Sequence, residues 1–170
     1  MEEVFVIDLS PDVTVRAESL FRKLAPVLRE LCPDGEVHHV GGTAIADVPT
    51  KGDLDIQVRL PAVALESAAL RVSEHYSRNY GGFNPPEGYS FEGKATDPPV
   101  GIHLTAFKGR CDLQWVFTKM LNEDASLRRR YVAIKNAYAG MSMADYRAAK
   151  ASFFEELAEL PTFAMIQRGG

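Results

Sequence analysis

The feature that most limits the fold of this chain is the alternation of apolar and polar residues over positions 53–60. Apolar side chains at every second position are typical of a β-strand with one buried face. The polar series begins with Asp53 and Asp55. Side chains two residues apart leave the same face of a strand, so these carboxylates point together, with backbones roughly 6.5 Å apart. We therefore expect a sheet in which one strand carries two parallel carboxylates.

A second short apolar run, residues 36–40, predicts another strand that ends at Gly41-Gly42-Thr43. Glycine N–H groups allow a phosphate to approach the backbone closely, and Thr43 adds a hydroxyl. Parallel carboxylates repel unless a cation lies between them, and Mg²⁺ binds through one or two carboxylates plus substrate phosphates. The two runs together predict a site for metal-assisted phosphoryl or nucleotidyl transfer. The alternative is that the Asp pair is the solvent face of an edge strand and that the glycines only form a turn.

Length and composition indicate one globular domain. The chain has 170 residues, of which 46% are hydrophobic and 25% are charged, which is enough for a sizeable core. Its formal net charge of −4 argues against a broad basic surface. We therefore expect no long nucleic acid as partner, whereas small phosphorylated molecules fit the charge balance.

Several classes of protein are excluded by missing patterns. Cys32 and Cys111 are far apart in the sequence, so neither a disulfide framework nor a zinc site is indicated. No apolar run reaches the roughly 18 residues of a membrane span, and the first residues are acidic. No P-loop, nucleophile elbow or metalloprotease signature occurs. We expect a cytoplasmic protein without a membrane partner.

The order of predicted elements is one helix, two strands, one helix, two strands and three helices, all in one α/β (α+β) domain. The ranges are a helix to residue 31, strands 36–40 and 53–60, a helix 62–76, an antiparallel pair of strands 89–94 and 101–108, and helices 113–121, 124–139 and 143–160. Residues 4–9 form either a short strand or a docked arm. In helix 62–76 the expected inner residues are Val63, Leu65, Leu70 and Val72. Within the single domain 1–170, the core spans about residues 1–112 and the last helices form a cap over about residues 113–160.

Two longer strings give a resemblance. Residues 37–44 read Val-His-His-Val-Gly-Gly-Thr-Ala, and residues 51–58 read Lys-Gly-Asp-Leu-Asp-Ile-Gln-Val. They resemble the GrpB family, which lies within the DNA polymerase beta-like nucleotidyltransferase superfamily. His103-Leu104 and the repeated Tyr-x-x-x-Lys pattern of the C-terminal helices are similar to the same family. The resemblance covers roughly residues 13–160.

The resemblance implies a small mixed sheet flanked by helices and a Mg²⁺-dependent or Mn²⁺-dependent nucleotidyltransferase. A nucleoside triphosphate would give its nucleoside monophosphate to a small-molecule or protein acceptor. The expected metal ligands are Asp53 and Asp55, and the expected phosphate-binding residues are Gly41, Gly42, Thr43 and Lys51. As an alternative, Lys51 is an ordinary exposed loop lysine.

Three further residues have expected supporting roles. Tyr131 and Lys135, like Tyr146 and Lys150, are four residues apart, so each pair shares a helix face. If these helices cap the sheet, both lysines reach the nucleotide; otherwise they lie on a solvated face. His103 is either a base or metal ligand, or a hydrogen-bonded strand histidine. For each of His38 and His39 we expect a structural, hydrogen-bonded role.

The chain also departs from the family pattern. Gly42 stands where the family usually has serine, and Thr105 replaces the second histidine of His-Leu-His. The superfamily commonly has a third carboxylate on a neighbouring strand, and residues 101–108 contain none. Asp112 and Glu92 are weak substitutes. These departures keep a second hypothesis open: a catalytically weak or inactive regulatory module that binds a nucleotide or a partner.

Overall fold

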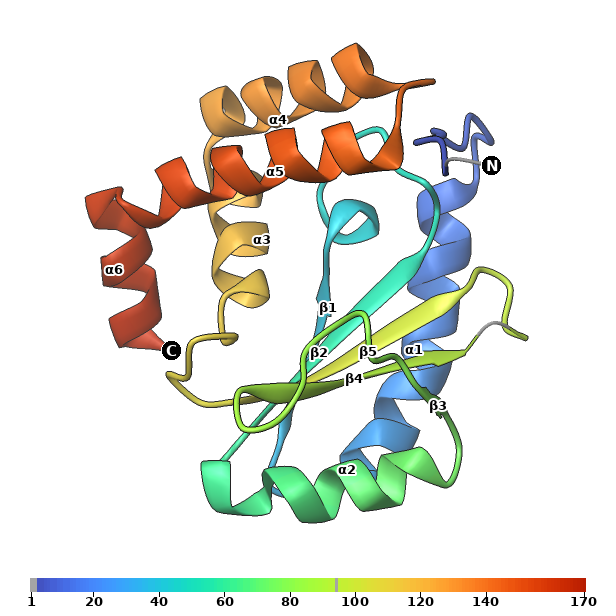
Figure 1. The fold of residues 1–170 in the computed structure, drawn as a ribbon, viewed down its shortest axis with the longest axis vertical. Coiled ribbons are helices and arrows are strands. Elements are labelled where there is room, and N and C mark those ends of the chain that lie inside the picture. Colours follow the sequence, from blue (N-terminus) through green and yellow to red (C-terminus); the bar gives the residue numbers. More distant parts are fainter. Residues whose placement is uncertain (1–2, 94) are drawn as a thin grey trace.

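The computed structural model describes residues 3–93 and 95–170, in which the strands form one mixed sheet with the order β1-β2-β5-β4-β3 (Figure 1). The strands are β1 (Glu36–Val40), β2 (Leu54–Leu60), β3 (Ser77–Arg78), β4 (Gly88–Gly93) and β5 (Val100–Ala106). Strands β2 and β5 are parallel, and the other neighbouring pairs are antiparallel. The predicted fold class and the predicted antiparallel pair β4–β5 are confirmed.

The helices lie in two groups. They are α1 (Val13–Leu31), α2 (Leu65–Ser73), α3 (Gln114–Glu123), α4 (Ala125–Tyr138), α5 (Met143–Ala158) and α6 (Pro161–Gly169), with short 3-10 turns η1 (Gly42–Ala44) and η2 (Ala62–Ala64). Helices α1 and α2 pack on one face of the sheet, whereas α4 and α5 lie side by side beyond the ends of β1 and β2 (Figure 1). None of the helices in the described ranges combines the length and the apolar character needed to cross a membrane.

Strand β2 owes its place at the centre of the sheet to its apolar residues. The side chains of Leu54, Ile56, Val58 and Leu60 are almost fully buried against α1 and α2. Because β2 hydrogen-bonds to both β1 and β5, it is not an edge strand, and that alternative is wrong. Gln57 and Arg59 on its other face are buried too. Only the acidic beginning of this face, with Asp53 and Asp55, is open to solvent.

Helix α2 corrects the prediction for residues 62–76. The chain first forms η2, and the regular helix begins at Leu65. Val63 and Leu70 were expected inside, but they are 94% and 65% exposed. The buried positions are Leu65, Ala68, Ala69 and Val72. This series has the i, i+3, i+4, i+7 spacing of a single helix face, and its two alanines let the helix approach the sheet closely.

The cap has its own apolar core and extends beyond its predicted end. Helix α4 begins at the N-cap Asp124, whose side chain accepts hydrogen bonds from Ser126 and Leu127 N–H. The last helix was predicted to end at residue 160, but Pro161 stands in the first turn of a further helix, α6, where proline's missing N–H costs little. Phe163 and Ile166 of α6 are buried in the cap core. The cap therefore runs to Gly169.

The N-terminal segment is a docked arm, one of the two expected alternatives. Phe5 N–H donates to the carbonyl of Met141, 2.9 Å away, and the carbonyl of Phe5 accepts from Gly140 N–H. The Phe5 side chain is fully buried and its ring stacks on Tyr146, with 3.7 Å between centroids. The arm thus packs against the helical cap, although it was assigned to the sheet core.

Candidate active site

A cavity of about 470 Å³ lies where β2 begins, between the turn after β1 and helices α3, α4 and α5. Most of the predicted site residues line it: Gly41, Gly42, Lys51, Asp53, Asp55, Lys135 and Lys150. Thr43 and His103 are not in this lining. The tertiary structure therefore brings together groups from the glycine turn, the acidic strand and the two Tyr-x-x-x-Lys helices.

The glycine turn lies directly against the acidic strand. Gly41 has φ +77°, and a Cβ atom there would stand only 2.5 Å from Asp55 Oδ2. Its N–H donates to the Thr118 hydroxyl of α3, at 3.2 Å. A Cβ atom on Gly42 would stand 3.2 Å from Lys135 Nζ. The positive φ of Gly41 therefore favours glycine at this position. The turn lies between Asp55, which is next to Gly41, and Lys135, which is next to Gly42.

Each of the two carboxylates lies beside a side-chain nitrogen. Asp53 Oδ2 is 3.2 Å from Lys51 Nζ, and Asp55 Oδ1 is 3.8 Å from His103 Nε2. The side chains of Asp53 and Asp55 are 40% and 38% exposed. Two accessible carboxylates on one strand face are hard oxygen donors that fit Mg²⁺ or Mn²⁺, provided that phosphates complete the coordination. Within the described residues no group of three or more His, Cys, Asp or Glu side chains could hold a metal without such help.

Thr43 is hydrogen-bonded to the backbone at Asp53 and does not line the cavity. Its hydroxyl donates to the carbonyl of Asp53 at 3.1 Å and also contacts His39 Nε2 at 3.0 Å. His39 Nδ1 in turn is 3.1 Å from Glu18 of α1. His39 is therefore a hydrogen-bonded structural histidine, as expected. The chain of contacts ties α1 to the backbone at Asp53.

His103 lies on β5 next to the acidic strand. In the parallel register, Gly101 is opposite Asp55 and His103 is opposite Gln57, all on the same face of the sheet. Its Nδ1 atom is 2.9 Å from the hydroxyl of Ser90 on β4, and its Nε2 atom is directed at Asp55. The histidine therefore occupies the neighbouring-strand region where a third carboxylate was sought.

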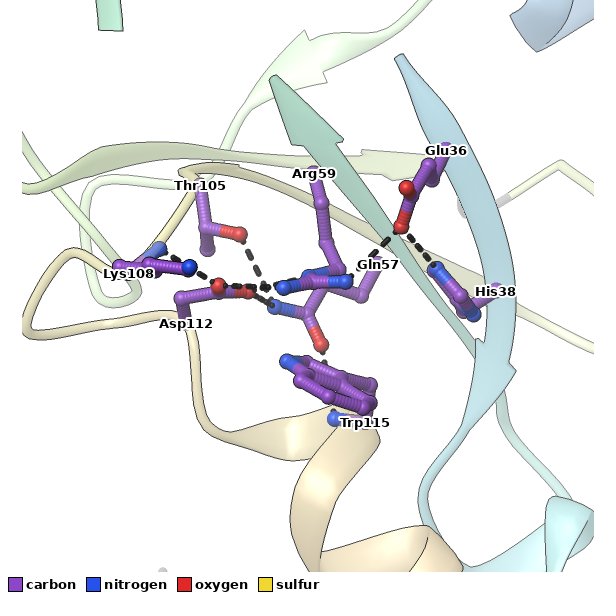
Figure 2. A network of polar contacts seen from close by, with 8 residues as sticks. All are labelled: Glu36, His38, Gln57, Arg59, Thr105, Lys108, Asp112 and Trp115. Atoms are coloured by element: carbon purple, nitrogen blue, oxygen red, sulfur yellow. Dashed lines mark hydrogen bonds and ion pairs between the residues drawn. The ribbon is translucent and has the colours of Figure 1, made fainter. Parts of the chain in front are cut away.

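Asp112 is committed to a buried network and is not available to a metal (Figure 2). Its Oδ1 and Oδ2 atoms accept from Arg59 Nε and Nη2 at 2.8 and 2.9 Å. Gln57 Nε2 and the backbone N–H of Lys108 donate to the same carboxylate. The Arg59 guanidinium also lies 4.0 Å from the centroid of the Trp115 ring. Asp112 is fully buried, so the weak substitute named from the sequence is a structural anion.

Two lysines of the cap, Lys135 and Lys150, line the cavity where burial disfavours their positive charge. Lys135 is 4% exposed, and burial, with Lys150 nearby, lowers its pKa to about 8 despite the opposing effect of Asp55. Burial also lowers the pKa of Lys150. The Lys135 ammonium lies 5.1 Å from the ring centroid of Tyr131 and 5.8 Å from that of Tyr146. The solvated-face alternative is therefore wrong for these lysines, and an anion in the cavity would stabilise both charges.

Several other lining residues were not indicated by any sequence pattern. Thr118 supports Gly41 from a helix whose pattern carries no catalytic motif, and Phe5 comes from the N-terminal arm. Arg147 and Arg110 add to the cationic side chains of the lining, which are Lys51, Arg110, Lys135, Arg147 and Lys150, against the carboxylates Asp53 and Asp55. The lining thus has five cationic side chains and two anionic ones, a surplus of three positive charges in a chain of net charge −4.

The family model described as GrpB protein matches residues 3–159. The chain belongs to the GrpB family. A UPF0157 protein of Vibrio cholerae is 28% identical over 141 residues, which cover 82% of this chain and 74% of that protein. The resemblance to the GrpB family is thereby confirmed.

Solved structures show the same fold. The conserved GrpB protein from Enterococcus faecalis matches with a TM-score of 0.57 and 17% identity over 88% of this chain and 97% of that one. The Cid1 poly(U) polymerase bound to MgGTP matches with a TM-score of 0.54 and 15% identity, and a cytoplasmic RNA terminal U-transferase with 0.51 and 16%. Each of these two matches covers 76% of this chain but only 43% and 40% of the larger proteins. The nucleotidyltransferase fold of this GrpB protein is thereby established.

Proposed function

We propose that this GrpB protein is a metal-dependent nucleotidyltransferase that moves a nucleoside monophosphate from a nucleoside triphosphate to a small-molecule or protein acceptor. One observation carries the proposal: a single cavity combines two accessible carboxylates at the start of β2 with a surplus of cationic side chains. Carboxylates alone would suit a bare metal ion, and lysines alone would suit a bare anion. Their combination suits a metal-bound polyphosphate, which carries both kinds of charge.

The roles of the residues follow from their positions. Asp53 and Asp55 would hold the Mg²⁺ or Mn²⁺ ion, which when bound draws negative charge from the phosphates and makes the reacting phosphorus more electrophilic. Lys51, beside Asp53, and the Gly41-Gly42 turn would meet the phosphates. Lys135 and Lys150 would neutralise them from the cap side. Thr43 would fix the backbone that presents Asp53.

A second function has one observation in its favour. In the described residues the neighbouring strand β5 offers His103 and no carboxylate, and Asp112 is sealed in its ion pair with Arg59. A protein with this arrangement would serve as a regulatory module that binds a nucleotide, or a partner, without transferring the nucleotidyl group. Binding without turnover is the result that distinguishes this function from the first.

Thermal unfolding with each of the four ribonucleoside triphosphates, with and without MgCl₂, tests the site. We expect the melting temperature to rise only when metal and nucleotide are both present, and the rise to disappear in Asp55→Asn. The control variant is Glu155→Gln, which removes an exposed carboxylate of α5 outside the cavity lining and should behave like wild type. No shift with any nucleotide, or equal shifts in wild type and Asp55→Asn, would overturn the proposal.

Two further measurements separate binding from transfer. Cys111 lines the cavity, whereas Cys32 is fully buried, so alkylation of Cys111 by a maleimide should slow when Mg²⁺ and nucleotide fill the cavity. Transfer is followed as label from an α-³²P nucleotide entering the small-molecule or protein fraction of a cell extract, with release of pyrophosphate. Protection of Cys111 without pyrophosphate release would favour the regulatory module.

A further inference from the structure

The starting observation is the environment of the Ser90 hydroxyl on β4. Ser90 is fully buried, and its Oγ atom accepts a hydrogen bond from Phe83 N–H at 2.8 Å. The same oxygen is 2.9 Å from His103 Nδ1. Among the described residues the structure shows no other acceptor for the hydroxyl hydrogen. Buried hydroxyl groups are almost always hydrogen-bonded, so this hydrogen is donated to His103 Nδ1.

This donation decides which nitrogen of His103 carries the ring proton. A neutral imidazole has one N–H group, and a nitrogen that accepts a hydrogen bond cannot be that group. With Nδ1 as acceptor, the proton is on Nε2, which is the atom directed at Asp55 Oδ1 across 3.8 Å. Gly101, two residues before His103 on β5, has no side chain to fill the space between these atoms: a Cβ atom there would stand 3.1 Å from Asp55 Oδ1 and 3.5 Å from His103 Nε2.

We infer that Ser90 fixes the ring proton of His103 on Nε2, the atom that lies 3.8 Å from Asp55 Oδ1, so that His103 is a positioning residue for the metal-binding carboxylate and not a general base. The catalytic part of this inference rests on the proposed nucleotidyl transfer, but the assignment of the ring proton does not. A base must have a free lone pair at the atom that faces the substrate. In His103 that atom is already protonated, and the lone pair points at Ser90.

The loop before β4 maintains the arrangement. Phe83 donates its N–H group to Ser90 Oγ and also lines the cavity. Its ring lies 5.4 Å from that of His103. A Cβ atom on Gly82 would stand only 2.4 Å from Ser90 Oγ, so the loop covers the hydroxyl closely. If the loop moved away, water could accept the Ser90 hydroxyl hydrogen, so that Ser90 could accept from Nδ1–H and Nε2 would become the unprotonated nitrogen. The position of the loop is therefore coupled to the proton on His103.

The ring proton can be measured without nucleotide or metal. Long-range ¹H–¹⁵N correlation spectra of ¹⁵N-histidine-labelled protein, recorded at alkaline pH, distinguish a protonated from an unprotonated ring nitrogen. We expect His103, identified by its missing signals in His103→Gln, to show protonated Nε2 and unprotonated Nδ1. In Ser90→Ala the signals should move toward the averaged pattern of the exposed His75. A protonated Nδ1 in wild type, or a pattern unchanged in Ser90→Ala, would overturn the inference.

A pair of substitutions tests the role in the site. Glutamine can place an amide N–H near the position of Nε2, whereas leucine places no polar atom there. His103→Gln should retain the Mg²⁺-dependent nucleotide affinity and the transfer rate within about threefold. His103→Leu should weaken both by about tenfold, because it removes the N–H dipole that faces the Asp55 carboxylate. A loss of transfer in His103→Gln as large as in His103→Leu would show that His103 is a base.

The two proposals fail in different ways. If wild type shows no response to any nucleotide, the proposed function and the catalytic role of His103 are both wrong, while the spectra still decide the proton assignment. If wild type responds to nucleotide but the spectra show a protonated Nδ1, only the inference about Ser90 and His103 is wrong.

Discussion

At the scale of single residues, Gly41 carries the most specific requirement. Alanine there would need a left-handed backbone and would bring its Cβ to 2.5 Å from Asp55 Oδ2. Gly140 is a matched control, because its φ of +82° is similar and nothing lies within 4 Å of its Cβ position. We expect Gly41→Ala to lower the free energy of unfolding by at least about 1 kcal/mol more than Gly140→Ala and to abolish the Mg²⁺-dependent nucleotide shift.

Urea unfolding and thermal melting of the two variants measure this difference. Equal losses of stability would mean that the turn relaxes away from Asp55. A retained nucleotide shift in Gly41→Ala would mean that the close contact between turn and strand is not part of the binding site.

Lys135 predicts a pH dependence of stability. Its pKa of about 8 in the folded protein lies below the ordinary value of 10.5 because the ammonium is buried, so the unfolded chain binds the proton more tightly. Stability therefore rises between about pH 8 and pH 10.5, and the full penalty, on the order of 2–3 kcal/mol, applies below pH 8. We expect Lys135→Met to be more stable than wild type at pH 7 and this advantage to shrink above pH 8.

Urea unfolding of both proteins at several values between pH 7 and pH 10 gives the difference directly. Inorganic pyrophosphate should stabilise wild type at pH 7 more than Lys135→Met, because an anion compensates the buried charge. A difference in stability that does not change with pH would show that Lys135 keeps an ordinary pKa.

At the scale of elements, the pairing of Arg59 with Asp112 joins β2 to the segment before α3. Removing one partner of a buried ion pair leaves the other charge uncompensated. Asp112→Asn should therefore cost about 3 kcal/mol of stability, whereas Glu36→Gln, which removes the exposed partner of Arg59, should cost less than about 1 kcal/mol. Urea unfolding measures both losses.

The same network separates structure from metal binding. The double variant Arg59→Met, Asp112→Leu should regain at least half of the stability lost in Asp112→Asn, because two apolar side chains leave no buried charge. Its nucleotide shift should still depend on Mg²⁺. If the shift disappears in this stable double variant, Asp112 takes part in metal binding after all.

At the scale of the whole molecule, the N-terminal arm connects the start of the chain to the cap that closes the cavity. Phe5 is fully buried, stacks on Tyr146 and lies 5.8 Å from Lys135 Nζ. Phe5→Ala should lower the free energy of unfolding by about 3 kcal/mol and weaken the nucleotide shift, since it opens a void beside a cavity wall. Val6→Ala, at a 62% exposed position, should change little. Similar melting of both variants would show that the arm is not docked in solution.

Strands β1, β2, β4 and β5 and the main helices were predictable because their signals are local, whereas the two-residue strand β3 was missed. The alternation over β2 and the capping residue Asp124 of α4 each act within a few residues. Helix α6 was missed because Pro161 can end one helix and begin the next, and the choice depends on where Phe163 finds its contacts. Val63 and Leu70 were misplaced because a short helix offers more than one apolar stripe, and the sheet surface selects among them.

The site was predictable only to the extent that its residues are motif residues. Asp53, Asp55, Lys135 and Lys150 share one cavity, as their spacing and the resemblance indicated. Thr43 could not be separated from the phosphate-binding residues, because the direction of its hydroxyl depends on His39 and on the carbonyl of Asp53. No pattern in the sequence pointed to a contact between His103 and Ser90.

The sequence by itself determined that two carboxylates share a strand face beside a glycine turn, because alternation and backbone freedom are properties of neighbouring residues. Only the tertiary structure decided that β2 is a central strand, that Asp112 forms a buried ion pair with Arg59, and that the buried Lys135 and the half-buried Lys150 line the same cavity as the carboxylates. The type of each ionisable side chain can be read from the sequence, whereas its desolvation and its hydrogen-bond partner depend on residues that contact it only in the folded protein.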